Sequence, residues 1–146
     1  MKKNLVRDWM SPNPVTIGPK ASVHEAHALM KDKHFRCLPV VEHDKLIGIV
    51  TLSDVLQAEP SKATSLSIYE INYLLAKITI DQLMSREVFT VQASATIRDA
   101  ARIMLEHDVS GLPVLDGDKL AGIITESDIF RVLVQAPQEV AEPASA

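Results

Sequence analysis

The hydrophobic and polar positions of the chain follow two periodicities that alternate along it. Short, nearly continuous apolar runs predict buried strands, and segments with apolar residues every three or four positions predict amphipathic helices. Two of these helices begin at Ser22-x-x-Glu25 and Thr96-x-x-Asp99, which have the spacing of a capping box. The other predicted elements are strands over residues 15–17, 38–41, 46–50, 89–91, 112–115 and 120–124, with second helices beginning near Ser53 and Ser127.

The same pattern occurs twice, because the chain repeats itself with an offset of 74 residues and no gap. Residues 38–40 and 112–114 both read Leu-Pro-Val, and Asp54 and Asp128 both end a Gly-x-x-Thr-x-Ser-Asp segment. Such repetition indicates one supersecondary unit per repeat, here with the order β-α-β-β-α. Neither unit can bury both apolar faces of its strands alone. We therefore predict an α+β fold in which two pseudo-twofold-related motifs pack through their sheets into one module.

The repeat divides the chain into four expected segments. Residues 5–58 form the first motif, 59–78 a linker, 79–134 the second motif, and 135–146 a tail. The tail is rich in Pro, Ala, Glu and Gln, a composition typical of disorder.

The linker is predicted to contain a helix that runs to Lys77. Ser67 and Glu70 have capping-box spacing, and an apolar stripe follows them. The stripe consists of Ile68, Ile71, Leu74, Leu75 and Ile78. Two interpretations remain open, a helix packed on the body of the module and a contact between two copies of the chain.

The composition narrows the functional classes. Of the 146 residues, 47% are hydrophobic, 23% charged and 4% aromatic, so we expect a globular protein with an aliphatic core. The formal net charge is -4 and no Lys/Arg cluster occurs, so no nucleic-acid partner is expected. No signal peptide or apolar run of ~20 residues is present, so no membrane association is expected. The single Cys37 fits a reducing compartment and a cytoplasmic location.

The sequence resembles a tandem pair of CBS (cystathionine-β-synthase) domains, also called a Bateman module. The resemblance is carried by Leu38-Pro39-Val40-Val41 with the segment 48–54, and by Leu112-Pro113-Val114-Leu115 with the segment 122–128. It covers roughly residues 5–134, and the paired occurrence makes it specific. The segment 64–75 is further similar to bacterial CBS proteins of the acetoin-utilisation type. Those proteins usually continue into a C-terminal ACT domain, which this sequence lacks.

The duplicated Gly-x-x-Thr-x-Ser-Asp segment can contact an adenosine nucleotide in two ways. Asp54 or Asp128 can accept hydrogen bonds from both ribose hydroxyls. The Thr and Ser hydroxyls lie at a predicted helix start, where backbone amides and the helix dipole favour a phosphate. A second interpretation is that Thr51-x-x-Asp54 and Thr125-x-x-Asp128 are capping boxes that only begin helices.

The resemblance implies that each nucleotide cleft is shared between the motifs, with the ribose-binding Asp of one motif facing the first strand of the other. One cleft would combine Ile123, Thr125, Ser127 and Asp128 with Met10, Val15 and Phe35. The other would combine Ile49, Thr51, Ser53 and Asp54 with Met84, Phe89 and Val109.

The two clefts are not expected to be equivalent. Family members often carry a cation just before the Leu-Pro-Val strand, where this chain has Arg36 in the first motif and Ser110-Gly111 in the second. Arg36 is therefore a candidate phosphate ligand. The small number of cations favours AMP or S-adenosylmethionine over longer polyphosphates, with ADP and ATP kept as candidates.

These features together predict a regulatory, metabolite-sensing module. It would form a homodimer and signal to an effector protein in trans. The alternative is a ligand-free structural dimerisation module. No enzyme activity or obligatory cofactor is expected, because no nucleophile–base pair is evident. His24 and His27 share a helix face but lack the further ligands that a zinc site requires.

Overall fold

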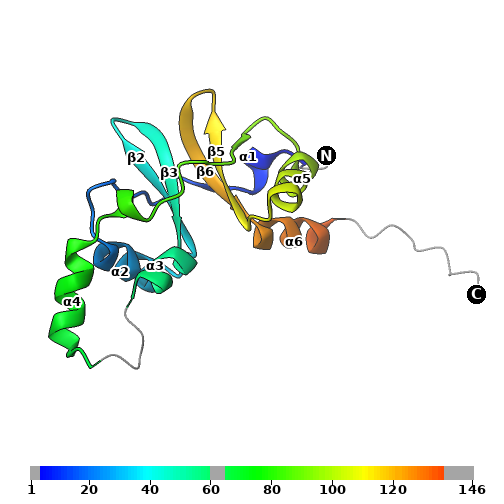
Figure 1. Ribbon diagram of the computed structural model, residues 1–146. Coiled ribbons are helices and arrows are strands. Elements are labelled where there is room, and N and C mark those ends of the chain that lie inside the picture. Colours follow the sequence, from blue (N-terminus) through cyan, green and yellow to red (C-terminus); the bar gives the residue numbers. More distant parts are fainter. Residues whose placement is uncertain (1–3, 60–64, 137–146) are drawn as a thin grey trace, which may run out of the picture.

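A computed structural model describes residues 4–59 and 65–136 (Figure 1). Residues 60–64 of the linker and all but the first two residues of the predicted tail lie outside the described residues. The elements are α1 (Val6–Trp9), β1 (Ser11–Pro12), α2 (Val23–Lys33), β2 (Cys37–Glu42), β3 (Lys45–Thr51), α3 (Leu52–Ala58), α4 (Ile68–Lys77), the 3₁₀ helix η1 (Ile80–Gln82), β4 (Val91–Gln92), α5 (Ile97–His107), β5 (Gly111–Asp116), β6 (Lys119–Thr125) and α6 (Glu126–Gln135).

The strands form an antiparallel hairpin, β2-β3, and a sheet with the order β1-β6-β5-β4. The α+β class and the paired strands of each repeat are thus confirmed. The predicted strand 15–17 is wrong, since Ile17 makes only an isolated parallel bridge with Val40. Pro14 and Pro19 flank that segment and lack the amide hydrogen that a longer ladder needs. Its counterpart, predicted over 89–91, is the short strand β4, which begins at Val91.

Side-chain caps begin the helices at the predicted residues. The Glu25 amide donates to Ser22 Oγ (3.1 Å), which begins α2. The Glu70 amide donates to Ser67 Oγ (3.2 Å), which begins α4. Each such cap satisfies a backbone amide that the helix itself leaves unpaired.

The first residues of each repeat pack on the other repeat. Figure 1 shows α1 beside α5, away from the β2-β3 hairpin of its own repeat. The Val6 amide donates to the Ala95 carbonyl (2.8 Å), and β1 pairs with β6. The corresponding segment of the second repeat does the reverse, because the Ile80 amide donates to the Ala21 carbonyl (2.9 Å) and Ser85 pairs with Ile49. The two repeats are therefore interlocked.

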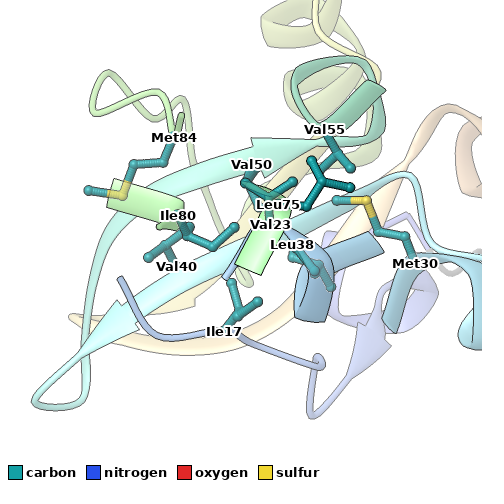
Figure 2. Packing of buried hydrophobic residues seen from close by; sticks show 11 residues of the cluster. Ile17, Val23, Met30, Leu38, Val40, Val50, Val55, Leu75, Ile80 and Met84 are labelled. Atoms are coloured by element: carbon teal, nitrogen blue, oxygen red, sulfur yellow. The ribbon is translucent and has the colours of Figure 1, made fainter. Parts of the chain in front are cut away.

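Each interlocked half has its own aliphatic core. Figure 2 shows the first core, where Ile80 lies beside Val40 and Val50 of the hairpin. Val6 occupies the equivalent position in the second core, and both Val6 and Ile80 are 0% exposed. Each core is thus completed by a side chain from the first residues of the other repeat.

The linker helix α4 packs on α2 through part of its apolar stripe. Leu75 is buried, and Ile71 and Ile78 pack against the first core. Ile68 and Leu74 remain exposed. The helix therefore packs on the body, as the first interpretation expected. Under the second interpretation, a second copy of the chain would contact the exposed residues Ile68 and Leu74.

Two glycines allow the interlocking segments to lie close to the sheets. A Cβ on Gly122 would lie 2.6 Å from both Met10 Sδ and the Ser11 carbonyl oxygen. A Cβ on Gly48 would lie 2.6 Å from Met84 Sδ and 3.0 Å from the Ser85 carbonyl oxygen. No side chain fits between these backbones without displacing one of them.

The substitution Gly122→Ala is expected to lower the free energy of unfolding by about 1–3 kcal/mol, because the methyl group overlaps a backbone oxygen that β1 holds in place. Guanidinium unfolding of the purified protein measures the effect. Gly18→Ala is the matched control, because nothing lies within 4 Å of its Cβ position. Equal stabilities of the two variants would contradict the close approach of β1 to β6.

Candidate functional site

The Gly-x-x-Thr-x-Ser-Asp segments connect the last strand of each repeat to the helix that follows. Thr51 and Thr125 end β3 and β6 and are the N-cap residues of α3 and α6. The carboxylates of Asp54 and Asp128 both turn back to accept the amide hydrogen of these threonines, each at 2.9 Å. The capping role that the spacing predicted is therefore confirmed, and it fixes where each carboxylate lies.

The two carboxylates differ in their remaining partners. Asp128 is 5% exposed, and its Oδ2 also accepts from the Thr125 hydroxyl (3.2 Å). Arg131 Nη1 donates to Asp128 Oδ1 at 2.7 Å. Asp54 is half-buried, and its Oδ1 has no hydrogen-bond partner among the described residues. Asp128 is thus satisfied on both oxygens, whereas Asp54 has an oxygen available.

A cavity of about 540 Å³ lies in front of Asp128, between the two repeats. We call it the Asp128 pocket. It brings together residues of the second repeat with the turn that precedes β2 of the first. The predicted site residues on its wall are Phe35, Arg36, Ile123, Thr125, Ser127 and Asp128; the others are Ser11, His34, Cys37, Ser110, Glu126 and Arg131.

Two residues predicted for this cleft do not line it. Met10 packs against the second core, with its sulfur over Gly122. Val15 packs against the first core. Both residues therefore belong to the cores, whereas the exposed ring of Phe35 lies on the wall of the pocket.

A second cavity of about 500 Å³, the Thr51 pocket, lies at the start of α3. It brings together Thr51 and Ser53, which the sequence analysis assigned to one cleft, with Arg36. Its other lining residues are Leu52, Leu56, Gln57 and Ser110. Arg36 and Ser110 line both pockets, so the two cavities adjoin where the repeats meet.

Other residues predicted for the first-motif cleft lie elsewhere. Ile49 and Asp54 do not line the Thr51 pocket. Met84 is 8% exposed and belongs to the first core, where it covers Gly48. The Phe89 ring stacks on the His107 ring, with centroids 3.7 Å apart. Val109, like Phe89, packs against the second core.

The two pockets differ in charge. Arg131 on α6 contributes a cation to the Asp128 pocket, and Gln57 occupies the equivalent position 74 residues earlier. His34 also lines the Asp128 pocket, and its counterpart in the second repeat is Asp108. The Asp128 pocket therefore holds the larger concentration of groups that can bind an anion.

The sequence analysis overlooked Arg131. The residue lies beyond the end of the Gly-x-x-Thr-x-Ser-Asp segment, so the motif does not include it. A signal was available, because residues three apart on a helix face the same side and Arg131 follows Asp128 at that spacing.

A third cavity, of about 540 Å³, opens between the two hairpin turns. Lys45, Arg86 and Asp118 contribute its charged groups. All three are exposed, and no buried carboxylate faces the cavity. It therefore lacks the fixed acceptor that distinguishes the Asp128 pocket.

The comparison with known families is decisive at this point. Residues 6–61 and 80–135 both match the family model described as CBS domain. The chain belongs to the CBS domain family. The Asp128 pocket is thus a cleft between the two members of a CBS domain pair.

Solved CBS domain pairs have the same arrangement. AcuB, an acetoin-utilization-type protein from Vibrio cholerae, is 30% identical with a TM-score of 0.73, over 89% of this chain and 90% of that chain. Protein MJ0100 in complex with 5′-methylthioadenosine and S-adenosyl-L-methionine is 30% identical with a TM-score of 0.73, over 89% and 95%. CBSX2 in complex with AMP is 30% identical with a TM-score of 0.73, over 91% and 98%.

Several relatives are longer proteins. The chain spans 32%, 23% and 36% of the length of three Methanocaldococcus jannaschii relatives that it matches. One of them, L-aspartate semialdehyde sulfurtransferase, is an enzyme that is 32% identical over 130 residues. Only part of each of these three relatives aligns with this chain.

Two further properties concern the described residues. Within 4–59 and 65–136, no helix is long and apolar enough to cross a membrane. The same ranges contain no group of three or more His, Cys, Asp or Glu side chains placed to hold a metal ion.

Cys37 lies on the wall of the Asp128 pocket and is half-buried. Burial raises the pKa of the Cys37 thiol. Since the thiolate is the nucleophile, a raised pKa means less reactive thiol at neutral pH.

Iodoacetamide is therefore expected to alkylate the folded protein at pH 7.5 several-fold more slowly than the guanidinium-unfolded protein, and the rate for the folded protein should rise at a higher pH than the rate for the unfolded protein. Mass spectrometry over time measures the rate, and it reports Cys37 alone because the chain has 1 cysteine. Equal rates for the folded and unfolded protein would contradict the burial of this thiol.

Proposed function

We propose that this CBS domain pair is a regulatory module that binds an adenosine nucleotide, with AMP as the preferred ligand, in the Asp128 pocket. The observation that carries the proposal is the buried Asp128 carboxylate, held between the repeats in one cavity with Arg36 and Arg131. A vicinal diol needs hydrogen-bond acceptors and a phosphate needs cations, and this cavity offers both.

Different residues of the pocket would contact the ribose, the base and the phosphate. Asp128 accepts from the ribose hydroxyls, and Phe35 and Ile123 provide apolar surface for the base. The phosphate lies near Arg36, Arg131 and the N-terminus of α6, whose dipole favours an anion. A volume of about 540 Å³ suits one small ligand.

Two structural relatives support the ligand class. CBSX2 has been solved with AMP, and MJ0100 with 5′-methylthioadenosine and S-adenosyl-L-methionine. An adenosine moiety is common to the three ligands. The arginines of the Asp128 pocket favour a ligand with a phosphate, and their small number favours a single phosphate over the longer chains of ADP or ATP.

The proposed output is a change in association with other proteins. A ligand can signal only if it prefers one arrangement of the module. The polar groups of the pocket bind and orient the nucleotide, and we assign them no catalytic step. The effector would be a separate protein, and the compartment the cytoplasm, as the reduced Cys37 suggests.

The helix pair α5-α6 supports a homodimer. These helices pack side by side (Figure 1). They expose Leu105 (84%), Phe130 (61%), Leu133 (70%) and Val134 (83%). Clustered exposed apolar side chains mark association surfaces, which also favours the alternative function, a structural dimerisation module.

Calorimetric titration with AMP, ADP, ATP and S-adenosylmethionine tests the ligand assignment. Asp128→Ala is expected to weaken AMP binding about tenfold or more, since it removes a charged acceptor of the ribose. Asp54→Ala is the matched control, because it removes the same kind of helix cap. 2′-Deoxy-AMP should bind more weakly than AMP. No heat with any ligand, in protein shown to be folded, would favour the dimerisation module.

Phe130→Asp is expected to convert a dimer into a monomer in analytical ultracentrifugation, because it places a charge within the apolar surface of α5-α6. Tyr69→Asp on α4, where the side chain is 83% exposed, distinguishes the two candidate surfaces. Dissociation by Tyr69→Asp alone would assign the contact to the linker helix instead.

A further inference from the structure

The Asp128 carboxylate already has a cationic partner within its own helix. Arg131 Nη1 lies 2.7 Å from Asp128 Oδ1, and the Arg131 side chain is 52% exposed. We infer that Arg131 is an exchangeable partner of Asp128, which the ligand's phosphate must draw away, so that the Asp128 pocket selects phosphorylated adenosine ligands over adenosine itself. The inference rests on the proposed function and deepens it.

The ribose diol and Arg131 compete for the same acceptor. Asp128 Oδ2 already accepts from both the amide and the hydroxyl of Thr125. Each carboxylate oxygen offers about two lone-pair sites. A diol that donates from both hydroxyls therefore needs both sites of Oδ1, and Arg131 occupies one of them.

The cost of this exchange depends on the ligand. Adenosine would displace Arg131 without offering it another anion, so the ion pair is lost uncompensated. A nucleotide brings its own anion into the same cavity, where the guanidinium can donate to phosphate oxygens beside Arg36. The half-exposed side chain has room to make this change without unfolding α6.

The first repeat contains the counterpart of Asp128, which is Asp54, without an arginine three residues later. Gln57 stands in the position equivalent to Arg131, and Asp54 Oδ1 has no partner among the described residues. An uncharged adenosine has no ion pair to displace there. The exchange mechanism therefore predicts phosphate selectivity only for the pocket that contains Arg131.

A second ion pair on the neighbouring helix provides a matched control. Arg102 Nη1 and Asp99 Oδ1 have the same spacing in sequence and lie 3.7 Å apart. Arg102 lines neither the Asp128 pocket nor the Thr51 pocket. Arg102→Gln thus removes the same charge as Arg131→Gln from the same kind of ion pair, at a position away from the ligand.

The test is calorimetric titration of adenosine and AMP into Arg131→Gln, with Asp128→Ala titrated alongside to identify the heat that belongs to the Asp128 pocket. The AMP dissociation constant is expected to rise about tenfold, as for loss of a charge-assisted hydrogen bond. The adenosine dissociation constant is expected to fall, because Asp128 Oδ1 is released; an unchanged value would mean that Arg131 binds phosphate without being displaced from Asp128. Arg102→Gln should change neither value.

The outcomes separate the inference from the proposed function. If Arg131→Gln weakens AMP and adenosine by the same factor, or changes neither, Arg131 does not select for phosphate and the inference is wrong. If neither ligand binds the unsubstituted protein, the proposed function itself fails. Gln57→Arg is the reciprocal variant, and it should raise the preference of the Thr51 pocket for AMP over adenosine.

Discussion

The structure depends on a pair of crossed backbone contacts. The Val6 amide bonds to the Ala95 carbonyl of the second repeat, and the Ile80 amide bonds to the Ala21 carbonyl of the first. Val6 and Ile80 are both 0% exposed, so each core is closed by a side chain delivered from outside its own repeat. Separating the halves would open both cores at once and leave these backbone groups without their native partners. The relative position of the two repeats is therefore set by the same contacts that stabilise each of them.

This constraint also builds the Asp128 pocket. The segment that carries Val6 continues into β1, which pairs with β6 and places Ser11 opposite Ile123. Both residues line the pocket. The turn before β2 and the first residue of β2 form another wall through Arg36 and Cys37. The shape of a cleft assembled from both repeats depends on their relative position, so a ligand that prefers one shape would favour one arrangement over another.

The sequence predicted what depends on local chemistry. The paired strands and the helix starts at Ser22, Ser67 and Thr96 follow from periodicity and capping, which involve residues close in sequence. The crossing of the leading segments depends on contacts between residues far apart in sequence, 89 positions for Val6 and Ala95 and 59 for Ile80 and Ala21, which one sequence does not reveal. For the same reason, Met84 was expected in a cleft, whereas it lies in the first core and packs against Gly48 of β3. Arg131 was missed because the repeat motif ends before it.

A duplicated fold need not have duplicated chemistry. The offset of 74 residues relates Gln57 to Arg131, Asp108 to His34, and Ser110 to Arg36. None of the three pairs changes a core residue, since all six side chains lie at the surface, so they leave the interlocked framework intact. Each pair nevertheless places the more basic side chain on the Asp128 pocket. Arg131 and His34 line the Asp128 pocket alone, whereas Arg36 lines both pockets, so the pseudo-twofold axis relates two backbones without relating two equivalent electrostatic environments.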